Sequence, residues 1–249
     1  MTQQVNDNLV LLCGKSAAGK SASLMGLENP EGVMYLNCEA GKKLPFRSKF
    51  MKGPDGQAGF VITDPFQVEE AFQAAEGMPH VHTIVVDSLT YLMDMYESLY
   101  VINATNTMKA WGDFAQYFKR LMQTHVAASS KNVIFIAHVK DQLNESEMVM
   151  ETSVPIKGSV KNNGVESYFS CIIAAKKVKL KDIEKYSSNL LTITPEEEAL
   201  GFKYVFQTKL TKETVNERLR GPLGLWDTDE TFIDNNMQLV LNRLHEYYN

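Results

Sequence analysis

The segment GKSAAGKS, at residues 14–21, most constrains what this chain can fold into. It fits the pattern G-x-x-x-x-G-K-[ST] and follows the apolar run LVLLC, so it lies where a buried strand turns into a helix. In that setting the glycines let backbone N–H groups wrap a phosphate, and the helix N-terminus adds positive potential. A plain glycine-rich turn does not account for Lys20 and Ser21 together. We therefore expect a nucleotide phosphate site here.

Within this site, Lys20 is expected to reach the outer phosphates and Ser21 to hold Mg²⁺, so the cofactors predicted are ATP and Mg²⁺. The pattern gives the Lys15 side chain no such task, and we expect it to be solvated. The residues predicted to bind the nucleotide are Gly14, Lys15, Ser16, Ala17, Ala18, Gly19, Lys20, Ser21 and Ala22.

Two carboxylates follow other apolar runs. Asp87 ends the run TIVVD, and it becomes the acid on the Mg²⁺ side if that strand lies beside the phosphate loop. The alternative is a strand-end aspartate that caps the next helix. Hydrolysis also needs a residue that orients a water, and no second carboxylate directly follows Asp87. Glu39, just past the run VMYLNC, is the candidate; a plain surface glutamate is the alternative.

The apolar runs alternate with helical patterns. Continuous runs of Val, Ile, Leu and Phe predict strands buried on both faces, at residues 9–13, 33–36, 60–62, 83–86 and 133–137. Apolar residues at three- and four-residue intervals predict helices over 89–99 and 111–125. Strands that alternate with helices form right-handed crossovers. The sequence therefore predicts an α/β fold with a mostly parallel central sheet flanked by helices.

The C-terminal half follows a different pattern. Runs at 171–178, 190–194 and 204–210 have short connections and predict antiparallel strands added to the sheet. An apolar stripe over 237–248 predicts a closing helix, capped near Asp234 or Asn235. The polar segment 140–164 is too long for a simple connection and is expected to be a functional or mobile loop.

Composition limits the remaining possibilities. A chain of 249 residues with 44% hydrophobic content can bury one core, so we expect a single domain over 1–249. It has neither a signal-peptide pattern nor the roughly 18 apolar residues of a membrane helix. We expect a cytoplasmic protein with no membrane partner, in the host cytoplasm if a phage encodes it. Cys13, Cys38 and Cys171 lack metal-ligand spacing and are expected to be reduced core residues. His80 and His82 lack a third ligand and are expected to lie in a loop.

The phosphate loop, Glu39, the segment VVDSLTYL and the strand VIFIAHVK together resemble the core of RecA-type recombinases and related hexameric helicases. The resemblance is closest to the small phage recombination ATPases of the single-strand annealing type, and it extends from about residue 8 to the C-terminus. It implies a RecA-like P-loop NTPase core in which Glu39 activates water, Asp87 serves the metal and His138 senses the γ-phosphate. His138 departs from the glutamine or asparagine of RecA itself but still offers a donor. A histidine satisfied at a strand end is the alternative.

The segment NERLRGPLG resembles the element that such ATPases insert into the ATP site of a neighbouring subunit. Arg218 and Arg220 would then be catalytic residues that act in trans. They would complete a site whose own subunit supplies the catalytic residues Lys20, Glu39 and His138. The resemblance therefore implies a homo-oligomer, as a ring or a filament. A basic pair beside a turn is the alternative, and a proline directly after the following glycine restricts the backbone here.

In RecA-like ATPases two loops face the central axis and hold DNA; here they correspond to 103–109 and 141–164. The net charge of -5 argues against a generally basic coat, but residues 157–185 carry seven lysines against three acids. Lysines at alternate positions 177, 179 and 181 would form a basic stripe along a strand; a solvated edge strand is the alternative. The candidate DNA-binding residues are Lys157, Lys161, Asn162, Asn163, Lys177 and Lys179.

Motifs and resemblance together favour a DNA-stimulated ATPase that binds single-stranded DNA, promotes annealing or pairing, and hydrolyses ATP at subunit interfaces. Its partners would be single-stranded DNA, further copies of the chain and a single-strand binding protein. Two alternatives stay open: a hexameric DNA helicase motor, and an ATP-gated scaffold or loader for recombination proteins.

Overall fold

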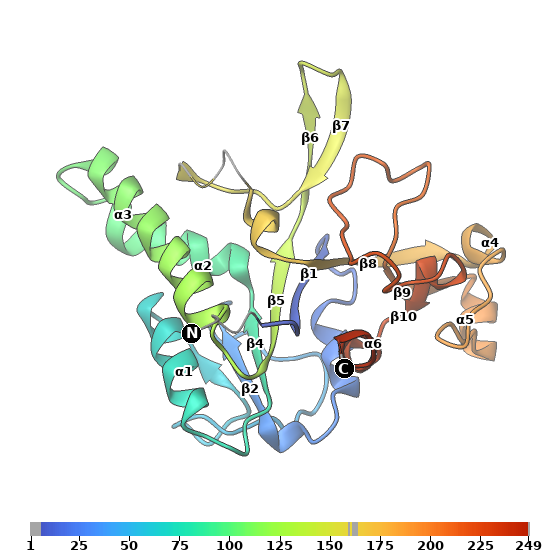
Figure 1. Ribbon diagram of the computed structural model, residues 1–249, viewed down its shortest axis with the longest axis horizontal. Coiled ribbons are helices and arrows are strands. Elements are labelled where there is room, and N and C mark those ends of the chain that lie inside the picture. Colours follow the sequence, from blue (N-terminus) through green and yellow to red (C-terminus); the bar gives the residue numbers. More distant parts are fainter. Residues whose placement is uncertain (1–5, 159, 161–163, 249) are drawn as a thin grey trace.

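The computed structural model describes residues 6–158, 160 and 164–248. In this part of the chain a sheet of eight strands forms the centre, in the order β10-β9-β8-β1-β5-β4-β2-β3, and β6 and β7 form a separate hairpin (Figure 1). The strands are β1 (Leu9–Gly14), β2 (Val33–Asn37), β3 (Phe60–Val61), β4 (Thr83–Asp87), β5 (Asn132–His138), β6 (Lys140–Asn144), β7 (Val149–Ser153), β8 (Cys171–Lys179), β9 (Phe202–Gln207) and β10 (Phe232–Asp234).

Most of the sheet is parallel. Strand β1 pairs in parallel with both β5 and β8, and β4 pairs in parallel with both β5 and β2. The antiparallel strands are β9 and β10, which extend the sheet beyond β8. The predicted α/β fold, with antiparallel strands in the C-terminal half, is confirmed.

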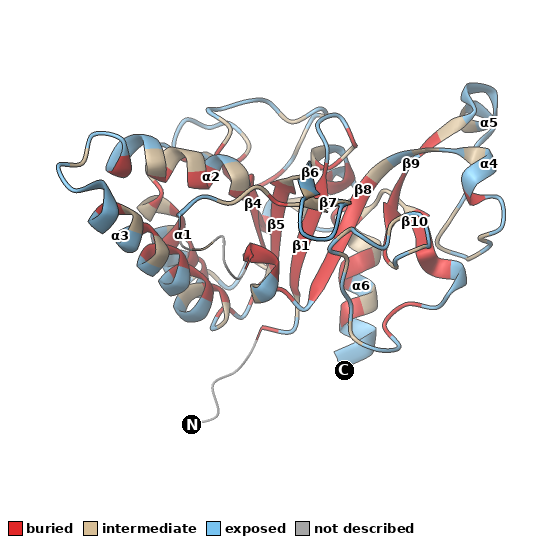
Figure 2. Cartoon of the chain, turned by 90° about the horizontal axis from the view of Figure 1, so that it is seen from above, coloured by how far each residue is buried: buried red, intermediate tan, exposed pale blue. Residues whose placement is uncertain are grey.

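Helices cover both faces of the sheet (Figure 2). The helical segments are η1 (Ser21–Gly26), η2 (Pro30–Gly32), α1 (Phe66–Glu76), α2 (Leu89–Tyr96), η3 (Glu97–Val101), α3 (Thr107–Arg120), η4 (Leu121–Val126), η6 (Val165–Tyr168), α4 (Leu180–Ile183), α5 (Pro195–Leu200), η7 (Asp229–Thr231) and α6 (Met237–Tyr248). The helices α1, α2 and α3 share one core with Leu11, while α6 and η1 share the other with Val10 and Leu12. Successive residues of β1 thus enter opposite cores, which explains its unbroken apolar run.

The predicted strand at 190–194 is wrong. Its β-branched residues favour a strand, but they stand directly before a helix start. Thr194 accepts a hydrogen bond from the backbone N–H of Glu197, the Glu197 carboxylate accepts one in return, and Pro195 occupies the first turn of α5. This capping box ends the extended segment, so only two antiparallel strands, β9 and β10, follow β8 in the described sheet.

Other boundaries also differ from expectation. The strand predicted at 60–62 is reduced to two residues, the one predicted at 204–210 ends at Gln207, and residues 107–109 of the predicted loop 103–109 belong to α3. Asn106 begins that helix early because its side chain accepts a hydrogen bond from the Lys109 N–H. The predicted closing helix is present, but its cap lies one residue beyond the expected Asp234 or Asn235. The side chain of Asn236 accepts a hydrogen bond from the Gln238 N–H.

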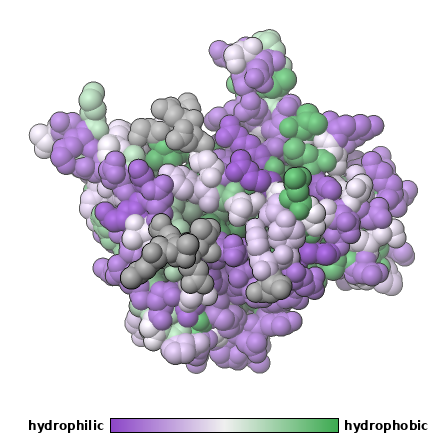
Figure 3. All heavy atoms as spheres, in the orientation of Figure 1, coloured by the Kyte–Doolittle hydropathy of each residue, from purple (hydrophilic) through white to green (hydrophobic). Residues whose placement is uncertain are grey.

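The predicted loop 140–164 begins instead as an antiparallel hairpin. Strands β6 and β7 pair from Lys140 with Ser153 to Asn144 with Val149, and the hairpin projects from the sheet (Figure 1). Leu143, Met148 and Met150 near its tip are exposed, where Figure 3 shows apolar atoms on a mostly hydrophilic face.

The three cysteines are free and buried, as expected. Burial raises the pKa of the Cys171 thiol to about 12, so this thiol is inert at neutral pH. Among the described residues, no helix has the length and apolar character needed to cross a membrane.

Candidate nucleotide-binding site

The phosphate loop leaves β1 at Gly14 and turns back over its end. Ala17 and Gly19 have positive φ, at 59° and 92°. A side chain at Gly19 would also meet the Asn235 amide at 2.8 Å, so both conformation and space demand glycine there. The helix expected after the loop is the short 3₁₀ helix η1, which Gly26 and the following Pro30 keep to six residues.

Lys20 lies inside this loop. Its Nζ donates to the Gly14 carbonyl at 2.9 Å and the Lys15 carbonyl at 2.8 Å, and lies 3.5 Å from His138 Nδ1. Burial lowers the pKa of Lys20, while the nearby charges of Asp87 and Glu39 oppose that shift. The cation is therefore held in the loop, at the position where it meets outer phosphates.

The metal-side pair predicted from the sequence is brought together. Ser21 Oγ donates to Asp87 Oδ2 at 2.8 Å, because β4 lies next but one to β1 and both strands end at the same edge. Tyr35 of β2 donates to the same oxygen at 2.9 Å. Burial raises the pKa of Asp87, although these two hydrogen bonds favour its ionised form. Hydroxyl and carboxylate oxygens are ligands that Mg²⁺ prefers.

Glu39 lies opposite, just past the end of β2, with its side chain only 8% exposed. Its Oε1 is 3.1 Å from His138 Nε2 and accepts from Ser88 Oγ at 3.3 Å. Its Oε2 accepts from Lys42 Nζ at 2.7 Å. The hydrogen bond from His138, aided by Lys42, lowers the pKa of Glu39 to about 2 despite partial burial. Glu39 is thus an ionised carboxylate at neutral pH, oriented from two sides.

These groups line one cavity of about 450 Å³. The nine residues predicted to bind the nucleotide divide here, since Ser16 to Ala22 line this cavity while Gly14 and Lys15 do not. Sequence reasoning missed Tyr35, Lys42 and Asn235, which also line it. A hydroxyl inside the apolar run VMYLN was a usable signal for Tyr35, whereas nothing in the sequence pointed to Asn235, which donates to the Gly19 carbonyl at 3.0 Å.

The Lys15 side chain is exposed, as expected, and it also forms an ion pair with Asp141 of the hairpin at 2.5 Å. His82 contacts Thr83 and the Asn29 carbonyl, as a loop residue does. Within the described ranges, no cluster of three or more His, Cys, Asp or Glu residues is placed to hold a metal ion.

Neither candidate arginine enters this cavity from its own chain. Arg218 lies 3.5 Å from Glu151 and 3.7 Å from Glu166. Arg220 is exposed, and its backbone forms an antiparallel bridge with Ile172 of β8. The bridge fixes the backbone of Arg220 and leaves its side chain exposed. Arg220 is therefore better placed than the ion-paired Arg218 to reach a neighbouring subunit.

The candidate DNA-binding residues are dispersed. Lys157 forms ion pairs with Asp94 and Glu97 of the α2–η3 segment, and Lys177 lies over the Phe202 ring at 4.6 Å. Lys179 ends β8, so the expected stripe stops there and position 181 falls in α4. Lys161, Asn162 and Asn163 lie outside the described residues. Their DNA contacts stay predictions.

The residues present fit ATP and Mg²⁺, because a glycine-turned cradle, a buried lysine and a paired hydroxyl and carboxylate meet in one cavity. Lys20 and the loop N–H groups would hold the phosphates, and Ser21 with Asp87 would hold the metal. The metal would neutralise phosphate charge as the terminal bond breaks. Glu39 would orient a water toward that bond, while His138 joins Glu39 to Lys20 across the cavity.

This fold and loop define a P-loop nucleotide-binding domain of the α/β class. A family model described as the AAA domain matches residues 6–203. The chain therefore belongs to the AAA domain family and is a P-loop ATPase, a class of domain that generally binds ATP and Mg²⁺. No curated protein matches the sequence.

Proposed function

We propose that this ATPase binds single-stranded DNA as a homo-oligomer of the phage-recombination type and promotes strand annealing or pairing. In this proposal Mg²⁺·ATP binding strengthens the grip on DNA, and hydrolysis at subunit interfaces weakens it. A single-strand binding protein is the expected protein partner, and we propose that the whole chain acts as one domain.

The observation that carries the proposal is the position of His138. It contacts both Lys20 and Glu39 at the end of β5, and the hairpin β6–β7 begins two residues later, at Lys140. A shift of His138 toward or away from a terminal phosphate would therefore move the first residues of the hairpin. In recombinases of the RecA type the segment after this strand holds DNA, and that resemblance supports the same use here.

A second contact joins the loop and the hairpin. Lys15 binds Asp141, and the other oxygen of Asp141 accepts from Thr152 across the hairpin at 2.8 Å. Lys15 is therefore placed to report the state of the phosphate loop to β6 and β7. This contact supports coupling between nucleotide and hairpin, although one exposed ion pair stabilises little by itself.

Charge limits where DNA would lie. The hairpin carries Asp141, Glu145, Glu147 and Glu151, which repel a phosphate backbone. The segment from 157 onward and the basic end of β8 are the more favourable path. The apolar residues at the hairpin tip suit contact with bases better than contact with phosphates.

The experiment is steady-state ATP turnover with and without single-stranded DNA, together with annealing of complementary strands and unwinding of a tailed duplex. We expect DNA to stimulate turnover and the protein to anneal strands without unwinding the duplex. Unwinding would select the helicase motor instead. Turnover that ignores DNA, without annealing, would select an ATP-gated scaffold or loader and contradict the proposal.

A further inference from the structure

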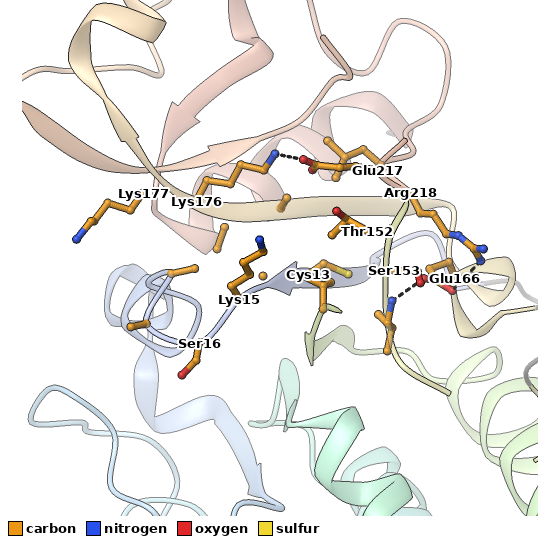
Figure 4. Close-up of a pocket in the computed structure, with 18 residues that line it drawn as sticks. Cys13, Lys15, Ser16, Thr152, Ser153, Glu166, Lys176, Lys177, Glu217 and Arg218 are labelled. Carbon is orange, nitrogen blue, oxygen red and sulfur yellow. Dashed lines mark hydrogen bonds and ion pairs between the residues drawn. The ribbon is translucent and has the colours of Figure 1, made fainter. Parts of the chain in front are cut away.

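A second cavity, of about 470 Å³, shares Ser16, Ala17 and Ala18 with the nucleotide cavity but is otherwise lined by different elements. Its walls are β8, the end of β7 and the segment 217–219 (Figure 4). Cavities of this size commonly hold a small organic ligand. Glu166 and the residues of β7, β8 and 217–219 that line it do not line the nucleotide cavity, so this space needs a separate explanation.

Glu166, in η6, carries an unmet hydrogen-bonding demand at one end of this cavity. The residue is 4% exposed, and its Oε1 accepts from the Val154 N–H at 3.0 Å. Its Oε2 forms an ion pair with Arg218 Nη1 at 3.7 Å but has no hydrogen-bond partner among the described residues. Because an oxygen that lacks a hydrogen-bond partner here can accept, a ligand that satisfies Oε2 brings an N–H or O–H donor.

The rest of the cavity specifies the shape and charge of that ligand. Its walls include the small or apolar side chains of Cys13, Ala174, Ala175 and Leu219, which suit a flat ring. Figure 4 places Glu166 and Arg218 at one end, Lys177 at the other and Lys15 between them. Lysines across the cavity from the carboxylate suit an anionic group carried on the same ligand as the donor.

We propose that this cavity binds one nucleoside monophosphate unit, with the exocyclic amine of the base donating to Glu166 Oε2 and the phosphate directed toward Lys15 and Lys177. The unit comes either from a free nucleotide or from single-stranded DNA, and the second source rests on the function proposed above. Cytosine, adenine and guanine each offer an exocyclic amine. Thymine offers only a ring N–H flanked by two carbonyl oxygens, which the carboxylate repels.

The first arm tests the site without DNA. Isothermal titration of the full chain, with the ATP site saturated by Mg²⁺·ADP, compares dCMP with dTMP. We expect dCMP to bind about tenfold more tightly, the scale of one good base-edge pair. In Glu166→Gln the amide both donates and accepts, so the ratio should fall to within about threefold. Glu213→Gln changes an exposed glutamate between β9 and η7, in the connection that contributes residues 217–219 to the cavity wall; it is the control and should keep the wild-type ratio.

Equal binding of dCMP and dTMP, no binding of either, or a preference that survives Glu166→Gln would each overturn the proposal. Thermal melting identifies a variant that fails to fold, and a folded Glu166→Ala must then also lose the preference.

The second arm compares cytidine and thymidine homopolymers of equal length. A cytidine preference that Glu166→Gln removes indicates single-stranded DNA as the source. Binding of dCMP without any binding of homopolymer leaves the cavity assignment intact and contradicts the proposed DNA function. Tight homopolymer binding with no base preference in either arm supports the DNA function and contradicts the cavity assignment.

Discussion

Replacing Glu39 with glutamine is expected to lower ATP turnover by about 10²–10⁴-fold, the usual contribution of a residue that accepts a proton or orients the attacking water. The amide keeps the size of the side chain and still accepts from His138 and Ser88, so the cavity should keep its shape. Nucleotide affinity should change little, because Lys20 and the loop N–H groups hold the phosphates. Single-turnover hydrolysis and a separate ADP titration measure the two quantities.

The control for Glu39 is Glu31→Gln, an exposed glutamate of η2 that should retain wild-type turnover. Because the pKa of Glu39 is about 2, its ionisation should leave the turnover of the wild type unchanged at any pH above about 4. If Glu39→Gln keeps full turnover with normal folding, the water-orienting assignment is wrong.

Replacing Arg220 with alanine is expected to reduce turnover by about 10³-fold, within the range measured for an arginine supplied to a phosphoryl-transfer site. Mixing Arg220→Ala with Lys20→Ala should restore activity above the sum of the separate proteins. The reason is that a Lys20→Ala subunit cannot hydrolyse ATP itself but still presents Arg220 to its neighbour. Turnover is measured across mixing ratios at fixed total protein.

Two variants sharpen this test. Lys212→Ala removes an exposed cation from the connection between β9 and η7 that also carries Arg220, and it should leave turnover unchanged. Arg218→Ala should have a smaller effect than Arg220→Ala, because Arg218 is engaged with Glu151 and Glu166 of its own chain. Wild-type turnover in Arg220→Ala would remove the in-trans role, and a mixture equal to the sum of its parts would place the arginine's action within one subunit.

The phosphate loop and its carboxylates were predictable because parallel strands end at one edge of a sheet. The apolar runs before Ser21, Glu39 and Asp87 predict parallel strands of one sheet, so these three side chains are expected at the same edge. The pattern of strands does not predict which side chains form hydrogen bonds with these residues. The hold of Lys42 and His138 on Glu39 depends on the path of the chain after β2 and on β5 lying beside β4.

The differences between the predicted and the observed fold have local causes. The run LLTIT at 190–194 has the composition of a strand, yet Thr194, Pro195 and Glu197 form the pattern of a helix N-terminus. The hairpin β6–β7 was missed because its residues are mostly polar and exposed, so no apolar face reveals the strand period. The ion pair from Lys15 to Asp141 depends on that hairpin, so no pattern in the sequence predicts it.

The most direct test of the account is the affinity for single-stranded DNA in each nucleotide state. Fluorescence anisotropy of a labelled oligonucleotide measures it without nucleotide, with Mg²⁺·ADP and with a slowly hydrolysed ATP analogue. We predict binding about tenfold tighter or more with the ATP analogue, a common size of coupling between two sites, and loss of that difference in Lys20→Ala. Equal affinity in all three states, or no binding to DNA in any, would contradict it.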